Sequence, residues 1–207
     1  MTDKVIRLLG RRFFVLGCLW GLAVSGSAWA ADDKQEKVPM SYIENLAELK
    51  TGQVFQSEEQ RNKKIFQVAK VLIKASPEAV YKVFTDYNHA PAIFSNLKKC
   101  KVISSVGQNK QVWFEAAAGG GLLKFEYVLE FKEHPPNSIE WHRVSGAFKT
   151  NEGDWKFEPR QNGQCTLVTY SKYVEAGFPF PQFLVRKELK DNMPTILTEL
   201  KKRLENL

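Results

Sequence analysis

The chain has 207 residues, a formal net charge of +7 and three cysteines. A single domain of this size buries a sufficient core without metal ions or disulfide bonds. Because lysine and glutamate are mixed along the chain and form no concentrated basic stripe, the composition indicates a solvated surface and argues against nucleic-acid binding. The mild positive charge is compatible with weak attraction to anionic lipid headgroups, and therefore with a transient membrane contact.

The first thirty residues have the pattern of an export signal. Four basic residues lie between positions 4 and 12, and the stretch 13–24 that follows is almost entirely apolar. Ala28 and Ala30 place small side chains at the two positions that a signal peptidase reads. The apolar run is shorter than the ~20 residues that span a bilayer. We therefore expect a signal peptide over 1–30, cleavage after Ala30 and a periplasmic protein.

The cysteines leave two questions open. Cys18 raises the alternative of a lipoprotein signal, although the apolar run continues past it through Leu22 and a lipidated cysteine should close such a run. Cys100 and Cys165 stay in the mature chain, where they form either a disulfide in an oxidising compartment or two separate buried thiols. Neither lies in a CxxC motif or near clustered histidines, so we expect no zinc site, and no pattern implies a cofactor.

The mature chain begins with an extension, and a folded domain follows it. Residues 31–52 are expected to form the N-terminal extension, with one short helix over 41–50, and the domain is expected to cover 53–207. Its first two strands are predicted at 53–56 and 63–74, the second rich in β-branched side chains.

A clear helix start follows the second strand. Ser76 is the expected N-cap, Pro77 suits the first helical position, and Glu78 favours the positive end of the helix dipole. Pro91 is expected to open a second short helix over 92–97.

The middle of the chain predicts a succession of antiparallel strands. Residues 123–132 give the clearest signal, because apolar and polar side chains alternate there with a period of two. Turns rich in glycine, asparagine and proline separate the strands, which we place at 102–106, 111–118, 123–132, 138–145, 148–159 and 164–174.

The C-terminal segment has a different period. Apolar residues recur at three- and four-residue steps from Val185 to Leu204, which predicts an amphipathic helix of about 25 residues. The expected fold is therefore α+β, with a curved antiparallel sheet of about seven strands around one long helix. Two short helices follow the first long strand, and a cavity is expected between the sheet and the long helix.

Two segments carry a resemblance to a known family. Residues 71–102 combine a strand, a Ser-Pro-Glu helix cap and a proline that restarts a helix, and residues 139–159 fit a hairpin pattern. The residues that fit this hairpin pattern are Trp141, Gly146, Phe148, Gly153, Trp155, Phe157 and Pro159. In these segments the chain resembles the START-like (SRPBCC) superfamily, which includes polyketide cyclase/dehydrase-type and coenzyme Q-binding proteins. The resemblance implies the helix-grip fold over residues 53–206 and the binding of lipids, sterols, quinones or polyketides.

Cavities for apolar ligands are lined mainly by hydrophobic and aromatic side chains. We expect the inward-facing residues of the strands and of the long helix to form such a lining. They are Phe114, Ala116, Phe125, Tyr127, Leu129, Trp141, Arg143, Phe148, Val185, Leu189, Met193 and Ile196. The alternative is that these side chains simply fill a core. Arg143 shares strand parity with Trp141, so it either pairs inside with a carboxylate or phosphate or reaches solvent at the strand end.

Candidates for acid–base catalysis are few. The chain has three histidines, and only His89, close to Asp86, is expected near the mouth of a cavity, where a capping or surface role is the alternative. No nucleophile motif, phosphate loop or metal-spaced cluster occurs, so we assign no catalytic residue and no metal ligand. The sequence thus predicts periplasmic binding or transport of a hydrophobic small molecule, and it leaves the oligomeric state open. The alternatives are a cyclase or dehydratase that uses His89, Asp86 or Tyr127, and an envelope protein-interaction module without a ligand.

Overall fold

The computed structural model describes residues 53–94, 96–118 and 123–205. The signal peptide predicted over 1–30 and the helix predicted over 41–50 lie outside the described residues. None of the helices within the described ranges is long and apolar enough to cross a bilayer.

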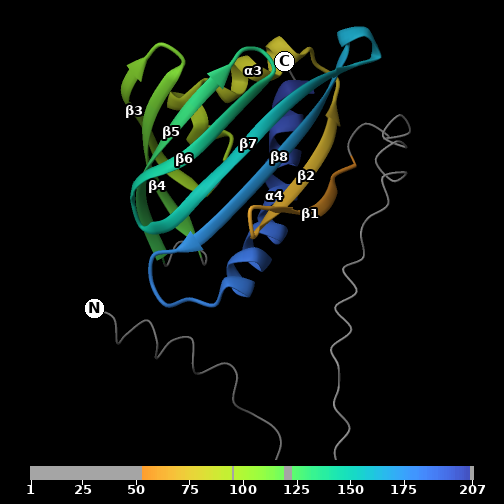
Figure 1. The fold of residues 1–207 in the computed structure, drawn as a ribbon. Helices are drawn as coiled ribbons and strands as arrows, with labels where there is room; N and C mark the ends of the chain where they lie inside the picture. Colours follow the sequence, from red (N-terminus) through yellow and green to blue (C-terminus); the bar gives the residue numbers. More distant parts are fainter. Residues whose placement is uncertain (1–52, 95, 119–122, 206–207) are drawn as a thin grey trace, which may run out of the picture. The chain divides into compact units, whose positions relative to one another are not determined.

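In the described part of the chain, eight antiparallel strands form one curved sheet in the order β1-β2-β8-β7-β6-β5-β4-β3 (Figure 1). The strands are β1 (Phe55–Arg61), β2 (Lys64–Ile73), β3 (Leu97–Val106), β4 (Asn109–Ala118), β5 (Leu123–His134), β6 (Ser138–Gly146), β7 (Phe148–Arg160) and β8 (Cys165–Ala176). Neighbours in the sheet are mostly neighbours in sequence, whereas β2 pairs with the distant β8. This long-range pairing joins the N-terminal hairpin to the rest of the sheet. The predicted α+β helix-grip fold is confirmed, with eight strands where about seven were expected.

The first helix begins as the sequence predicts. In α3 (Pro77–Phe84) the Ser76 hydroxyl accepts a hydrogen bond from the Ala79 amide at 3.3 Å, and Pro77 occupies the first turn. This cap satisfies one of the amides that a helix start leaves unpaired.

The second short helix lies earlier than the sequence predicts. It is the 3₁₀-helix η2 (Tyr87–Ala92), and the prediction of a helix over 92–97 is wrong. Pro91 lies inside η2 instead of opening a helix after it. The chain cannot stay helical beyond this point, because Leu97 already begins β3 and pairs with Ala116 of β4. Strand pairing therefore overrides the local signal of the proline.

The long helix α4 (Gln182–Glu205) covers only the strands at one end of the sheet. It packs on β2 and β8 and touches β1, as Figure 1 shows. Its buried residues are Met193, Leu197, Leu200 and Leu204. The concave face of β4 to β6 is consequently left to other side chains, which matters for the position of the cavity. One further short 3₁₀-helix, η3 (Gln161–Gly163), joins β7 to β8.

The cysteines of the domain are two separate thiols. Cys100 lies on β3 and Cys165 on β8, with four strands between them in the sheet, and neither is in a disulfide. Cys100 packs against the main core, whereas Cys165 belongs to a small cluster with Leu72 and Leu167. The described core is therefore held without a disulfide bond.

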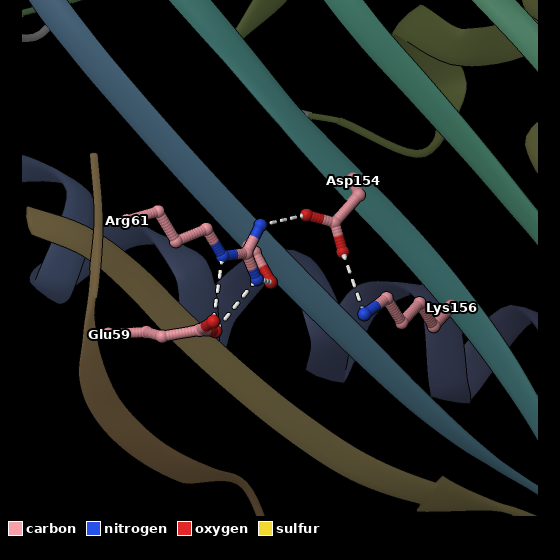
Figure 2. Close-up of polar contacts among 5 residues, drawn as sticks. Glu59, Arg61, Asp154 and Lys156 are labelled. Carbon is pink, nitrogen blue, oxygen red and sulfur yellow. Dashed lines mark hydrogen bonds and ion pairs between the residues drawn. The ribbon is translucent and has the colours of Figure 1, made fainter. Parts of the chain in front are cut away.

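The outer face of the sheet carries a network of charged side chains (Figure 2). The Arg61 guanidinium reaches from β1 across β2 and β8 and donates to the Asp154 carboxylate on β7. It also donates to Glu59 at 2.7 and 2.9 Å and to the Ser171 hydroxyl at 3.1 Å, while Lys156 lies 4.0 Å from Asp154. The two carboxylates raise the pKa of Arg61 further above its ordinary value. This network ties the edge strand β1 to the middle of the sheet.

Candidate functional site

A cavity of about 100 Å³ lies between the concave face of the sheet, the η2–β3 segment and one side of α4. It is lined by Phe84, Tyr87, Ala90, Phe94, Asn96, Leu97, Phe114, Tyr127, Leu129, Phe131, Ile139, Trp141, Trp155, Tyr170, Lys172 and Ile196. Most of these side chains are buried. Those that keep some exposure are Phe94, Asn96, Leu97, Lys172 and Ile196, and they mark where the cavity meets solvent. The mouth therefore lies between the η2–β3 segment and the side formed by β8 and α4.

The walls of the cavity are aromatic. Trp155 and Tyr170 stack with ring centroids 3.7 Å apart and an interplanar angle of 9°, and Phe84 lies 4.3 Å from Trp155. On the opposite wall Phe114 and Tyr127 stack at 5.3 Å. Alternation along each strand explains this lining, because residues two apart point to the same face of the sheet. The resulting surface is mainly aromatic, with side chains of the kind that line sites for apolar ligands.

Gly153 positions one of the two tryptophan rings that line the cavity. It is the cross-strand partner of Trp141, and a Cβ atom on Gly153 would lie 2.3 Å from the indole of Trp141 and 2.2 Å from the carbonyl oxygen of Ser171. The absence of a side chain thus lets the indole lie over β7. There its Nε1 donates to the buried Asn151 Oδ1 at 3.4 Å, which fixes the ring orientation.

One tyrosine of the lining is already engaged in a polar cluster. The Tyr87 hydroxyl donates to the buried Glu133 carboxylate at 2.9 Å, which also accepts from Tyr81 at 3.1 Å and from Lys110 at 2.6 Å. Burial and the adjacent Glu133 carboxylate raise the pKa of Tyr87. Tyr87 is therefore a neutral donor whose hydroxyl is already engaged by Glu133.

Two other tyrosines present free hydroxyls. Within the described residues, neither the Tyr127 nor the Tyr170 hydroxyl has a hydrogen-bond partner, although both side chains line the cavity. Burial raises the pKa of both phenols, so they stay protonated at neutral pH. Each can orient a ligand oxygen as donor or acceptor.

Lys172 is the one charged residue in this lining, as far as the described residues show. It lies two residues after Tyr170 on β8 and points to the same face, between Gln67 of β2 and Gly153 of β7. Burial lowers the pKa of the Lys172 ammonium to about 8. It is half-buried because the cavity opens beside it. No acidic side chain is among the lining residues.

The structure brings five of the twelve predicted site residues to the cavity: Phe114, Tyr127, Leu129, Trp141 and Ile196. Ala116, Phe125, Phe148, Leu189 and Met193 belong to the surrounding hydrophobic core. Arg143 and Val185 lie outside this lining. The Arg143 guanidinium donates to the Gly146 carbonyl at 3.0 Å near the strand end, and its Nε has no partner among the described residues. Ligand contact by any of the twelve stays a prediction.

Several lining residues were not among those predicted. Phe131 continues the alternation of β5, and Lys172 follows two residues after Tyr170 on a predicted strand, so the strand period was the available signal. The lining residues Tyr87, Ala90, Phe94, Asn96 and Leu97 had no such signal, because their place beside the cavity depends on how η2 packs against β3.

The histidines lie away from the cavity. His89 Nδ1 is 2.8 Å from the Asp86 carboxylate, but both side chains are exposed and neither lines the cavity. His142 is exposed, and its Nε2 lies 3.9 Å from Glu130 Oε1. In the described ranges no group of histidine, cysteine, aspartate and glutamate residues is arranged to hold a metal ion.

The sheet, the helix and the aromatic cavity together define a helix-grip protein of the START-like class. The family described as polyketide cyclase/dehydrase and lipid transport matches residues 73–201, and the chain belongs to this family. No curated protein sequence matches the chain significantly.

Several solved structures share the fold. A START superfamily protein from Mycobacterium smegmatis has a TM-score of 0.62 and 19% identity over 68% of this chain and 97% of its own. A STAR-related lipid transfer protein fragment from Xanthomonas axonopodis has a TM-score of 0.60 and 17% identity, over 73% and 92% of the two chains. The Zhui aromatase/cyclase from Streptomyces sp. R1128 has a TM-score of 0.59 and 13% identity, over 74% and 94%. These identities establish the common fold and nothing finer.

Proposed function

We propose that the protein binds a hydrophobic small molecule, of the lipid, quinone or polyketide kind, in the aromatic cavity and carries it in the periplasm. The observation that carries this proposal is an open cavity whose walls are mainly aromatic and apolar, with a few polar groups among them. Burial of apolar ligand surface there contributes roughly 25 cal/mol per Å². The family description includes lipid transport, and the Xanthomonas neighbour is a lipid transfer protein, which supports a carrier.

The size of the cavity constrains how a ligand binds. At about 100 Å³ it is smaller than the ~150 Å³ cavity that holds benzene and than the roughly 300–1,000 Å³ of typical ligand pockets. A lipid-sized molecule therefore has to widen it. Its borders are the η2–β3 segment and Ile196 of α4, so we propose that these two parts separate when the ligand enters.

The lining supports a binder more than an enzyme. A general acid or base must reach its substrate, and of the three residues considered for catalysis only Tyr127 lies at the cavity. His89 and Asp86 pair with each other on the exposed surface. The cyclase or dehydratase alternative consequently depends on Tyr127, and a ligand-free interaction module gives no reason for an open aromatic cavity.

One measurement tests both binding and export. We expect native mass spectrometry of protein purified from its own envelope fraction to show a chain that begins at Ala31 and carries an apolar molecule removable by organic extraction. Leu129→Arg places a guanidinium on the cavity wall, and unpaired charge is unfavourable there, so the bound fraction should fall about ten-fold or more.

Val128→Arg is the matched control, because the neighbouring residue on β5 points to the opposite face of the sheet and should retain the bound molecule. The binding proposal is wrong if the wild-type protein is empty and takes up no quinone, sterol or fatty acyl probe. A measured mass that includes residues 1–30, or a lipid on Cys18, contradicts the proposed export and cleavage.

An exposed aromatic patch supports a transient membrane contact. Phe178, Phe180, Phe183 and Leu184 are 48%, 38%, 62% and 37% exposed, and the rings of Phe178 and Phe180 touch with centroids 5.7 Å apart. Soluble proteins rarely expose clustered large apolar side chains without a binding role. Basic residues follow at once at positions 186, 187 and 190 of α4, which suits a bilayer with anionic headgroups.

We expect the double variant Phe180→Ser with Phe183→Ser to lose several-fold of its sedimentation with vesicles of phosphatidylglycerol and phosphatidylethanolamine, because inserted aromatic area is removed. Ile103→Ser with Val106→Ser is the control, since these exposed residues of β3 lie outside the patch. Equal sedimentation of both double variants, or none for the wild type, would contradict a membrane role of the patch.

A further inference from the structure

Lys172 is a charged residue on the cavity lining, and the binding of a purely apolar ligand does not explain its position there. It lies on the concave face of β8, two residues after Tyr170, and its cross-strand partner on β7 is Gly153. The Trp141 indole lies over Gly153. Its side chain is half-buried at the mouth of the cavity. A lysine that needed only solubility would lie on the outer face, as Lys156 does.

No acid in the described part of the chain neutralises this ammonium. Lys172 Nζ has no hydrogen bond and no ion pair among the described residues, and its pKa is lowered by burial alone. The cross-strand neighbour on β2 is the uncharged Gln67, whose Nε2 donates to Glu58 of β1 at 2.9 Å. The Glu58 carboxylate therefore lies on β1, one strand farther from Lys172 than Gln67, and it already accepts the Gln67 hydrogen bond. At neutral pH, Lys172 is mostly protonated and lacks a counter-ion, which is unfavourable beside an apolar wall.

We propose that Lys172 binds the carboxylate of an amphipathic carboxylic acid whose apolar part lies against the aromatic wall. This inference rests on the proposed function and narrows its ligand to acids. A carboxylate accepts hydrogen bonds on two oxygens, and the unpaired Tyr170 hydroxyl, two residues before Lys172 on the same face, supplies a second donor. The acid group then stays at the mouth, while the apolar part extends toward Phe114, Leu129 and Phe131.

A pair of probes that differ only in charge tests this proposal. Parinaric acid is a fluorescent fatty acid, and its methyl ester has the same chain without the carboxylate. At pH 7 the wild-type protein is expected to bind the acid about ten-fold or more tightly than the ester, as a charge-assisted hydrogen bond predicts. In Lys172→Met the affinity for the acid should fall by about ten-fold, while the ester binds as in the wild type.

The control variant and the ester separate the outcomes. Lys156→Met removes an exposed lysine of the outer face and should leave both affinities unchanged. Ester binding by Lys172→Met shows that the variant is folded. If the wild type binds neither probe, the proposed function fails and this inference fails with it. If it binds both probes equally and Lys172→Met changes neither affinity, the function stands and the role of Lys172 is overturned.

Discussion

Gly153→Ala is expected to destabilise the domain by about 3 kcal/mol or more, because the added methyl group has no room. Its nearest atoms would be the Ser171 carbonyl oxygen at 2.2 Å and the Trp141 ring at 2.3 and 2.6 Å. The carbonyl belongs to the paired strand β8 and cannot move without breaking the β7–β8 ladder. The indole can leave only by giving up its place on the cavity wall and its hydrogen bond to Asn151.

Urea unfolding and thermal melting measure this effect. A loss of 3 kcal/mol lowers the melting temperature of a domain of this size by about 6–12 °C. Gly107→Ala is the matched control: Gly107 has a positive φ of 57°, but nothing lies within 4 Å of an added Cβ. That variant should cost only about 1–2 kcal/mol of backbone strain. A Gly153→Ala protein as stable as Gly107→Ala would show that the close packing of Trp141 on β7 is not what the structure indicates.

Lys172→Met is expected to have the opposite effect and to stabilise the ligand-free protein by about 1–3 kcal/mol at pH 7, since solvent at the cavity mouth screens part of the cost of burial. Burial lowers the pKa of Lys172 to about 8 from its ordinary 10.5, so folding a protonated Lys172 is unfavourable. Methionine keeps the length of the side chain and removes the charge. A residue that destabilises the empty protein yet binds a ligand acid would fit the trade-off common at functional sites.

The difference in stability between Lys172→Met and the wild type should depend on pH, and the lowered pKa of Lys172 fixes its direction. Between pH 8 and 10.5 the unfolded chain binds the proton that the folded chain has lost, so wild-type stability rises through this window relative to Lys172→Met. The extra stability of Lys172→Met over the wild type should therefore be full below pH 8 and nearly absent above pH 10.5. The other titratable lining residues are Tyr87, Tyr127 and Tyr170, whose pKa values burial raises, and both proteins share them.

Denaturation of both proteins at several pH values between 7 and 10 decides the matter. A constant difference in unfolding free energy across this range would mean that the Lys172 charge is not destabilised in the folded protein. A variant less stable than the wild type at pH 7 would mean that Lys172 already has a counter-ion.

Local rules account for the elements that the sequence predicts well. In β5 each residue's face depends only on its position in the strand, so alternation along 123–132 located both the strand and its inner side chains. Ser76 and Pro77 mark the start of α3 through a hydrogen bond and a backbone angle that are confined to one turn. The amphipathic period likewise located α4.

Which elements meet was decided by tertiary structure. The pairing of β2 with β8 brings together residues far apart in the sequence, and α4 packs on this pair and not over β4 to β6. Ile196 is therefore the α4 residue at the cavity, although Val185, Leu189 and Met193 follow the same period. Leu97 pairs with Ala116 in the sheet, so the helical stretch ends early at Ala92 and the residues near Leu97 come to line the cavity.

By itself, the sequence determined the α+β class, the order of strands and helices along the chain, and the inward faces of the strands, because periodicity and caps act within a few residues. Only the tertiary structure decided where the cavity lies, that Gly153 makes room for Trp141, and that Lys172 meets an apolar wall without an acid in the described residues. These properties depend on neighbours across the sheet, and no local pattern records which neighbour a side chain will have.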